Sequence, residues 1–290
     1  MPPLSRVTVD EIRRAKQKAR KLVMLTAYDY SFAKLVDESG VDIVLVGDSL
    51  AMVVLGEQDT TTVTQQDMLR HAKAARKGVT RALLVGDLPY PAIHSAGADL
   101  TAAARAFIEE AGCDAVKVEW ADGMPNRVRK VLASGIAVMG HVGLTPQTAL
   151  AEGGFGMRGK DAASAARILS QAQALEQAGC FAIVLECVPD QVAQAITERL
   201  AIPTIGIGSG PNCDGQVLVL HDVLGLFERF TPKFVKRYAK LSEEVRNAVR
   251  AYAGEVRSGQ FPGASQTVKM SREEESHLRR LLKSESKNKT

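Results

Sequence analysis

The 290-residue sequence is poor in several features that would indicate particular classes of protein. It has only four cysteines, none of them in a CxxC pair, and no histidine at zinc-ligand spacing, so a zinc site of that kind is not indicated. Cys113 and Cys180 each follow an Ala-Gly at the start of an apolar run, which is typical of small buried thiols. This cysteine usage favours a reducing compartment.

Long apolar runs and a strong charge excess are also missing. No stretch approaches the roughly 18 apolar residues of a membrane span, and residues 1–20 contain no apolar core of a secretory signal. Residues 264–290 hold seven Lys and Arg against four Glu, so this tail carries +3 of the net charge of +4. The remaining body is nearly neutral, which argues against nucleic-acid binding. We therefore expect a cytoplasmic protein that binds neither membranes nor nucleic acids.

Short apolar runs alternate with amphipathic stretches along the chain. The runs are apolar throughout rather than alternating, as in strands that are buried on both faces. About eight strand–helix units in a chain of this size predict a (β/α)₈ TIM barrel, which typically takes ~250 residues. The expected strands are residues 21–29, 41–49, 81–89, 113–120, 136–144, 180–189, 202–210 and, with less support from the pattern, 233–239.

A doubly wound open sheet is the structural alternative to the barrel. Such a sheet usually carries a glycine-rich first turn, whereas the first expected strand is followed by "TAYDYS", which has no glycine. We expect one catalytic barrel domain with an N-terminal helix over residues 1–263, closed by a helix at 241–259. The charged tail at 264–290 is expected to be partly disordered, with a short amphipathic helix around "EEESHLRRLL" as the alternative.

The word "VGD" ends two of the expected strands, in "VLVGD" at 44–48 and in "LLVGD" at 83–87. Catalytic groups of such barrels come from the C-terminal ends of the strands. We interpret Gly47 and Gly86 as residues that let the backbone turn closely there. Asp48 and Asp87 then project from neighbouring strands toward one point, and converging carboxylates favour a hard cation such as Mg²⁺. Each aspartate taken alone is equally well explained as a helix N-cap.

Four further polar residues stand at expected strand ends. Lys117 and Glu119 are two apart and share one face of a strand, where a plain ion pair is the simpler explanation. His141 is equally well explained as a core histidine bonded to backbone. Glu186 lies in the apolar run "AIVLECVP", and desolvation disfavours the charged form of a carboxylate, which suits a general base or acid.

Several stretches in this order resemble the ketopantoate hydroxymethyltransferase family. They include "LTAYDYSFAKLVDESGVDIVLVGDSLAM", "LLVGDLPY", "AVKVE", "GHVGLTPQ", "VLECVP", "IPTIGIGSG" and "CDGQVLVLHDVLG", and they extend over about residues 22–262. The resemblance implies a barrel of the phosphoenolpyruvate/pyruvate superfamily type and a homo-oligomer, a decamer of two pentameric rings. It also implies transfer of a hydroxymethyl group from 5,10-methylenetetrahydrofolate to 3-methyl-2-oxobutanoate. The product is 2-dehydropantoate, in the first step of pantothenate biosynthesis.

The resemblance also implies roles for individual residues. Asp48, Asp87 and Glu119 match the Mg²⁺ ligands of the family. Ser49 and Lys117 match its 2-oxoacid-binding residues, together with Asp48 and Asp87. Glu186 matches the proton acceptor, and His141 a histidine that lines the site. The sequence departs from the family pattern at two positions that flank the expected site. Ala51 stands where relatives usually have Gly, and Trp120 stands where relatives often have Gly.

The implied chemistry is physically consistent with these residues. A 2-oxoacid chelates Mg²⁺ through its carboxylate and keto oxygen, so the metal can stabilise an enolate. A Mg²⁺-dependent 2-oxoacid lyase or a carbon–phosphorus mutase of the same superfamily is the alternative enzyme. Those relatives carry a catalytic cysteine in a mobile loop, and the stretch "TALAEGGFGMRGK" has none. A non-catalytic binding barrel is the third reading, and it predicts the loss of strand-end carboxylates that are all present here.

Overall fold

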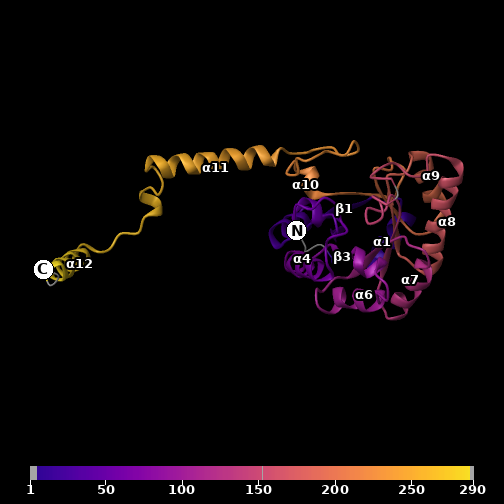
Figure 1. Ribbon diagram of the computed structural model, residues 1–290, viewed down its shortest axis with the longest axis horizontal. Coiled ribbons are helices and arrows are strands. Elements are labelled where there is room, and N and C mark those ends of the chain that lie inside the picture. Colours follow the sequence, from indigo (N-terminus) through magenta and orange to yellow (C-terminus); the bar gives the residue numbers. More distant parts are fainter. Residues whose placement is uncertain (1–4, 152, 288–290) are drawn as a thin grey trace. The chain divides into compact units, whose positions relative to one another are not determined.

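The computed structural model describes residues 5–151 and 153–287, and it contains the expected closed barrel (Figure 1). Eight parallel strands pair in sequence order, and β1 closes the barrel by pairing with β8. Seven of the eight strands lie within the ranges expected from the sequence. The strands are β1 (Leu22–Thr26), β2 (Ile43–Val46), β3 (Leu83–Asp87), β4 (Ala115–Glu119), β5 (Val138–Gly143), β6 (Ala182–Glu186), β7 (Thr204–Ile207) and β8 (Gly215–Leu218).

The prediction of the eighth strand at residues 233–239 was wrong. The barrel is instead closed by the short strand Gly215–Leu218, whose Gly215 pairs with both Leu22 of β1 and Ile205 of β7. Both neighbouring strand edges are therefore already hydrogen-bonded, and residues 233–239 have no edge left to join. They form turns, in which the Tyr238 amide donates to the carbonyl of Val223 at 2.8 Å.

Helices lie outside the strands and follow them in alternation, and Figure 1 labels α4, α6, α7, α8 and α9 around the barrel. Thr64 is the N-cap of α4, where Thr64 and Asp67 form a reciprocal capping box. The helices of this part are α1 (Val9–Gln17), α2 (Tyr30–Glu38), α3 (Leu50–Val53), α4 (Gln65–Gly78), α5 (Tyr90–His94), α6 (Leu100–Glu109), α7 (Met124–Ala133), α8 (Ala162–Ala178), α9 (Asp190–Arg199) and α10 (Leu220–Val223).

The core has two layers because side chains alternate across each strand. In β2, Val44 and Val46 belong to the layer between strands and helices, whereas Ile43 and Leu45 belong to a second cluster inside the barrel. The inner cluster also contains Ile12 and Ala15 of α1. The N-terminal helix thus seals the barrel interior and leaves the opposite end, where the strands finish, available for a site.

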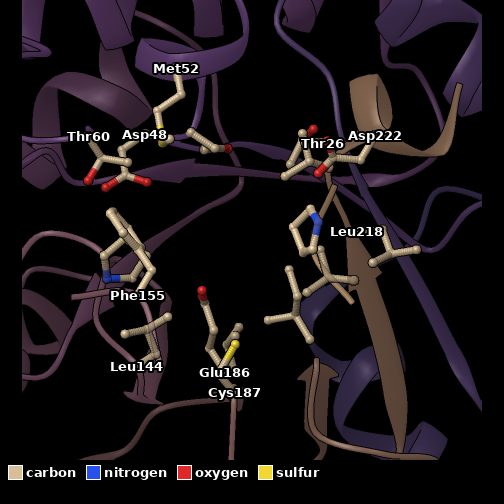
Figure 2. Close-up of a pocket in the computed structure, with 18 of the residues that line it drawn as sticks. Thr26, Asp48, Met52, Thr60, Leu144, Phe155, Glu186, Cys187, Leu218 and Asp222 are labelled. Atoms are coloured by element: carbon tan, nitrogen blue, oxygen red, sulfur yellow. The ribbon is translucent and has the colours of Figure 1, made fainter. Parts of the chain in front are cut away.

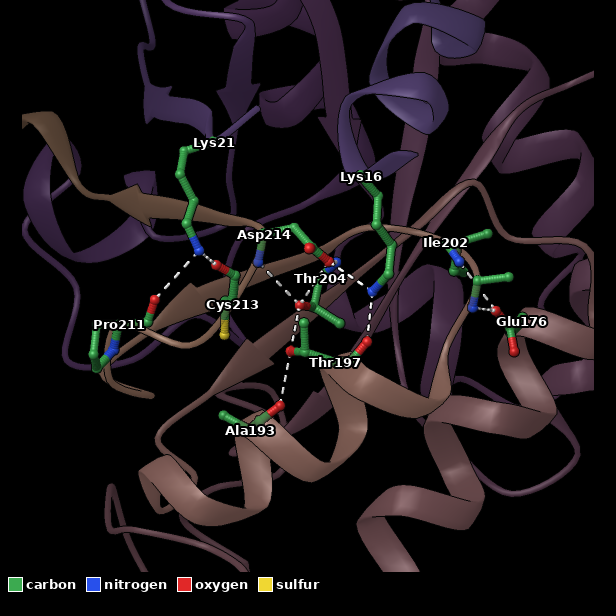
Figure 3. A network of polar contacts seen from close by, with 11 residues as sticks. Lys16, Lys21, Glu176, Ala193, Thr197, Ile202, Thr204, Pro211, Cys213 and Asp214 are labelled. Carbon is green, nitrogen blue, oxygen red and sulfur yellow. Dashed lines mark hydrogen bonds and ion pairs between the residues drawn. The ribbon is translucent and has the colours of Figure 1, made fainter. Parts of the chain in front are cut away.

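Polar side chains reinforce the end of the barrel at which α1 packs (Figure 3). Lys16 Nζ of α1 lies 2.9 Å from Asp214 Oδ2, and the same carboxylate oxygen accepts from the Thr204 amide at 2.9 Å. Thr204 Oγ1 is in turn 2.7 Å from Thr197 Oγ1 of α9. These contacts tie the N-terminal helix to the beginning of β7 and β8.

A buried carboxylate holds the turn that leads into β3. Asp37 of α2 accepts hydrogen bonds from the amides of Thr80, Arg81 and Ala82, the last at 2.7 Å. Burial raises the pKa of Asp37, but these hydrogen bonds to its charged form outweigh burial and lower the pKa below its ordinary value. The turn is therefore held by a charged group that stays ionised.

Residues 240–290 form a second unit, whereas residues 1–239 form the first. The structure thus divides the chain at 239/240 rather than at 263, and the helix expected to close the barrel, α11 (Leu241–Ser258), belongs to the second unit. A short turn, η1 (Ala264–Gln266), precedes α12 (Arg272–Lys287), so residues expected to be partly disordered form a helix. No helix in the described part of the chain is long and apolar enough to cross a membrane.

Candidate active site

A cavity of about 650 Å³ opens at the C-terminal ends of the strands. The last residue of six strands lines it, namely Thr26, Asp87, Glu119, Glu186, Ile207 and Leu218. Figure 2 shows Asp48 and Asp222 on opposite sides of this cavity, with the Glu186 carboxylate pointing into it between them. All seven site residues predicted from the sequence line the cavity: Asp48, Ser49, Asp87, Lys117, Glu119, His141 and Glu186.

The two aspartates of the repeated "VGD" lie side by side, as expected. The Asp48 amide donates to Asp87 Oδ2 at 3.2 Å, and Asp87 Oδ1 lies 2.8 Å from Lys117 Nζ. Lys117 and Asp87 are buried, with side chains 5% and 1% exposed. Burial lowers the pKa of Lys117, but Asp87, Glu119 and Asp48 outweigh it and keep the amine charged. Burial raises the pKa of Asp87, Lys117 opposes this rise, and Asp48 adds to it.

The two glycines of the repeat are not turn residues, which corrects the sequence interpretation. Neither has the left-handed φ that favours glycine. A Cβ at Gly86 would lie 2.3 Å from Cδ1 of the fully buried Phe107 of α6, so Gly86 is required for helix packing. A Cβ at Gly47 would lie 3.0 Å from the Ser49 hydroxyl. Glycine therefore lets the neighbouring groups approach the strand ends.

His141 lies between two carboxylates at the ends of β4 and β6. Its Nδ1 is 3.4 Å from Glu119 Oε1, and its Nε2 is 3.2 Å from Glu186 Oε2. Burial and the charge of Lys117 lower the pKa of His141, but its contacts with Glu119 and Glu186 outweigh them and raise it to about 9. The ring nitrogens of His141 thus face carboxylates, and the alternative of a core histidine bonded to backbone does not hold.

Gln147 is a site residue that the sequence interpretation missed. It is 3% exposed and lies in the loop after β5. Its Nε2 donates to Asp48 Oδ2 at 3.0 Å and to the Leu88 carbonyl at 2.9 Å, while its backbone amide donates to Glu119 Oε2 at 3.2 Å. One residue thus holds two of the predicted metal ligands. The only sequence signal was its place in the stretch "GHVGLTPQ".

The acidic residues suit a divalent cation, although they do not form a complete preformed coordination site. No group of three or more His, Cys, Asp or Glu in residues 5–151 and 153–287 has the arrangement of a metal site. Glu119 Oε1, however, is buried and accepts no well-aligned hydrogen bond from these residues. Burial and the charge of Glu119 raise the pKa of Asp48 to about 6. A cation would relieve this repulsion, and Mg²⁺ needs only one or two protein carboxylates when substrate and water complete its shell.

Cys187 and Trp120 directly follow the strand-end carboxylates Glu186 and Glu119. Cys187 follows Glu186 and has φ of 48°, an uncommon conformation for a residue other than glycine. Burial raises the pKa of the Cys187 thiol to about 12, so it is a poor nucleophile at neutral pH. Trp120 follows Glu119, is partly buried, and donates its amide to the His141 carbonyl at 2.9 Å.

The opposite wall of the cavity carries another carboxylate and an aromatic rim that the sequence interpretation missed. Asp222 of α10 is 8% exposed, and burial raises its pKa to about 6. Phe227 and Phe230 follow α10 and pack edge to face, with ring centroids 5.3 Å apart. Phe155, from the loop between β5 and α8, lies on the other side of the cavity, below Asp48 in Figure 2.

Comparisons with known proteins agree with this architecture. The model of a family described as ketopantoate hydroxymethyltransferase matches residues 6–264. A 3-methyl-2-oxobutanoate hydroxymethyltransferase from Syntrophus aciditrophicus is 51% identical over 257 residues, covering 89% of this chain and 94% of the relative. One of the same name from Oleidesulfovibrio alaskensis is 52% identical over 271 residues, covering 93% of each.

Solved structures with the same fold are more distant in sequence. Phosphoenolpyruvate phosphomutase from Streptomyces platensis has a TM-score of 0.57 at 13% identity, covering 97% of this chain and 98% of its own. A 2,3-dimethylmalate lyase of the PEP mutase/isocitrate lyase superfamily has a TM-score of 0.56 at 16% identity, covering 94% of this chain and 98% of its own. These likenesses concern the barrel fold.

Proposed function

The chain belongs to the ketopantoate hydroxymethyltransferase family, and from this premise we propose that its cavity transfers a hydroxymethyl group to 3-methyl-2-oxobutanoate, giving 2-dehydropantoate. The donor in this proposal is 5,10-methylenetetrahydrofolate, and the reaction is the first step of pantothenate biosynthesis. The relatives are hydroxymethyltransferases, so the chain is an enzyme of the transferase class.

The observation that carries the proposal is the buried, mixed-charge cluster at the ends of β2 to β6. Lys117 is held by Asp87 with its amine toward the cavity floor, 3.4 Å from His141 Nδ1. The Lys117 amine supplies positive charge where a 2-oxoacid brings a carboxylate and a keto oxygen, and His141 adds a ring nitrogen beside it. Ser49 adds a hydroxyl that lies 2.9 Å from the Tyr28 hydroxyl and is therefore fixed in place.

Asp48 and Glu119 are the residues best placed to hold Mg²⁺, and Asp87 supports them from the neighbouring strand. When bound there, the ion would act as a Lewis acid on the keto oxygen of the substrate. Gln147 fixes one oxygen of each of the first two carboxylates, and their second oxygens would bind the cation. Of these, Glu119 Oε1 also lies 3.4 Å from His141 Nδ1. This arrangement limits the reorganisation that metal binding requires.

Glu186 is the proposed general base that removes the C3 proton of the oxoacid. Its carboxylate points into the cavity (Figure 2), and its side chain is 16% exposed, so substrate can reach it. His141 Nε2 lies 3.2 Å from Glu186 Oε2 and orients this carboxylate.

A direct test is the formation of 2-dehydropantoate by the purified full chain from 3-methyl-2-oxobutanoate and 5,10-methylenetetrahydrofolate with Mg²⁺. A second readout is exchange of the C3 proton into deuterated water when the folate is omitted. Product in the first assay and exchange in the second are expected. Binding of the oxoacid without exchange or product would instead favour a barrel that only binds ligands.

The same proposal includes the cytoplasm as location and a homo-oligomer, a decamer of two pentameric rings, as assembly. Family resemblance supports both. Sedimentation equilibrium of the full chain would measure the assembly, and a mass of one or two protomers would contradict the rings.

A further inference from the structure

Asp222 is a buried carboxylate that takes no part in the proposed proton transfer or in the proposed metal site. It lies in α10, is 8% exposed, and lines the cavity on the wall opposite Asp48 (Figure 2). No hydrogen bond or ion pair to its side chain occurs within the described part of the chain. Burying an unpaired carboxylate is costly, so a group that supplies donors to Asp222 is expected from the cavity side.

Arg237 is the cation whose charge acts on Asp222, but its guanidinium is engaged elsewhere. It donates to the Phe227 carbonyl at 3.4 Å and to the Thr231 hydroxyl. Thr26, the nearest strand-end hydroxyl on this wall, accepts from the Leu220 amide at 3.0 Å. The contacts of Arg237 and Thr26 are thus with other groups, and the Asp222 oxygens are available to a ligand from the cavity.

Aromatic side chains follow Asp222 along the chain and line the same cavity. Phe227 is 8% exposed, whereas Phe230 is 51% exposed, so one ring presents open surface on this wall. Flat conjugated ligands bind such rings by stacking or edge contact. The combination of a carboxylate and aromatic rings favours a planar heterocycle with adjacent N–H donors on one edge.

We propose that Asp222 binds the 2-amino-4-oxopyrimidine edge of the one-carbon carrier, accepting hydrogen bonds from its ring N–H and its exocyclic amino group. The inference rests on the proposed function and adds a recognition site for its second substrate. Paired bonds from two N–H groups to one carboxylate are strong and directional. Phe227 and Phe230 contact the ring system, Glu186 lies between the two walls, and the oxoacid cluster around Asp48 lies opposite.

The test compares Asp222→Asn with the wild-type chain and with Asp190→Asn as the control. Asp190 begins α9, accepts from Asn212 Nδ2 at 2.9 Å, and does not line the cavity. Calorimetry with tetrahydrofolate as the probe is expected to show affinity reduced about 10- to 100-fold for Asp222→Asn, the range for lost charge-assisted hydrogen bonds. Asp190→Asn should bind it as the wild type does. Affinity for 3-methyl-2-oxobutanoate should be the same in all three chains.

A ligand variant tests the same contact without altering the protein. A tetrahydrofolate analogue with a methyl group in place of the 2-amino group should bind the wild-type chain about 10-fold more weakly than the parent. The Asp222→Asn chain should discriminate less between the two. Equal binding of parent and analogue by the wild type overturns the inference, as does unchanged tetrahydrofolate affinity in Asp222→Asn. Failure of the wild type to form 2-dehydropantoate would instead contradict the proposed function.

Discussion

Replacing Glu186 by Gln removes the proposed base while keeping the shape and size of the side chain. Its carboxylate contacts His141 Nε2 at 3.2 Å, and an imidazolium can donate to the amide oxygen of glutamine at the same place. The metal-binding groups are on other strands, and Gln147 holds Asp48 and Glu119 independently of Glu186. Binding of Mg²⁺ and 3-methyl-2-oxobutanoate should therefore change little.

The rate, in contrast, should fall by the contribution of a general base. That contribution is about 10²- to 10⁴-fold, which corresponds to about 3–5 kcal/mol of activation free energy. The loss should be equal for C3 exchange without folate and for product formation with it, because both require removal of the same proton. Deuterium exchange followed by proton NMR measures the first reaction, and chromatography of 2-dehydropantoate measures the second.

Glu198→Gln provides the matched control, since Glu198 makes an exposed contact with Gln194 on α9 and does not line the cavity. This control should exchange and turn over as the wild type does. Exchange by Glu186→Gln at close to the wild-type rate would refute the assignment of Glu186 as the base.

Further substitutions test three features: the metal site, the packing and the turn into β3. Asp48→Asn and Asp87→Asn should each abolish Mg²⁺-supported binding of the oxoacid in calorimetry without changing the far-ultraviolet circular dichroism, and unchanged metal affinity in both would remove the metal assignment. Gly86→Ala should lower the free energy of unfolding by about 1–3 kcal/mol through overpacking, and adding Phe107→Leu should recover part of this loss in urea unfolding; an additive loss would contradict the contact. Asp37→Asn should cost roughly 1.5–3 kcal/mol near neutral pH. Because the folded-state pKa of Asp37 is lowered, its stabilisation is present above the ordinary aspartate pKa and disappears as pH falls through the folded value. Wild-type and variant stabilities should therefore converge in acid, and a constant difference would count against the charged anchor.

The barrel was predictable because its strands are buried on both faces, and this produces apolar runs of unusual uniformity. The eighth strand was missed because β8 is only four residues long and follows β7 with no helix between them, so it does not repeat the strand–helix spacing of the other units. Pairing of β8 with β1 and β7 decides closure, and no local pattern reports a contact between the two ends of a barrel.

The residues of the candidate site could likewise be predicted only in part. Strand-end carboxylates such as Asp48 and Asp87 could be identified because their position follows from the strand pattern. Gln147 could not, because its role depends on a loop that brings it across two strands to Asp48. Asp222 could not be identified either, because its place in the cavity beside aromatic residues arises only when the chain folds.

Trp120 gives this protein an internal optical signal. It is the single tryptophan in the sequence, so its indole emission is not mixed with that of another. The residue directly follows Glu119 and is tied through its amide to the carbonyl of His141, which places the fluorophore on the strand that supplies a predicted metal ligand. Its emission wavelength depends on local polarity, so a shift in Glu119 or His141 is expected to change it. Titrations with cation and oxoacid can thus be followed in the unlabelled native chain, one ligand at a time.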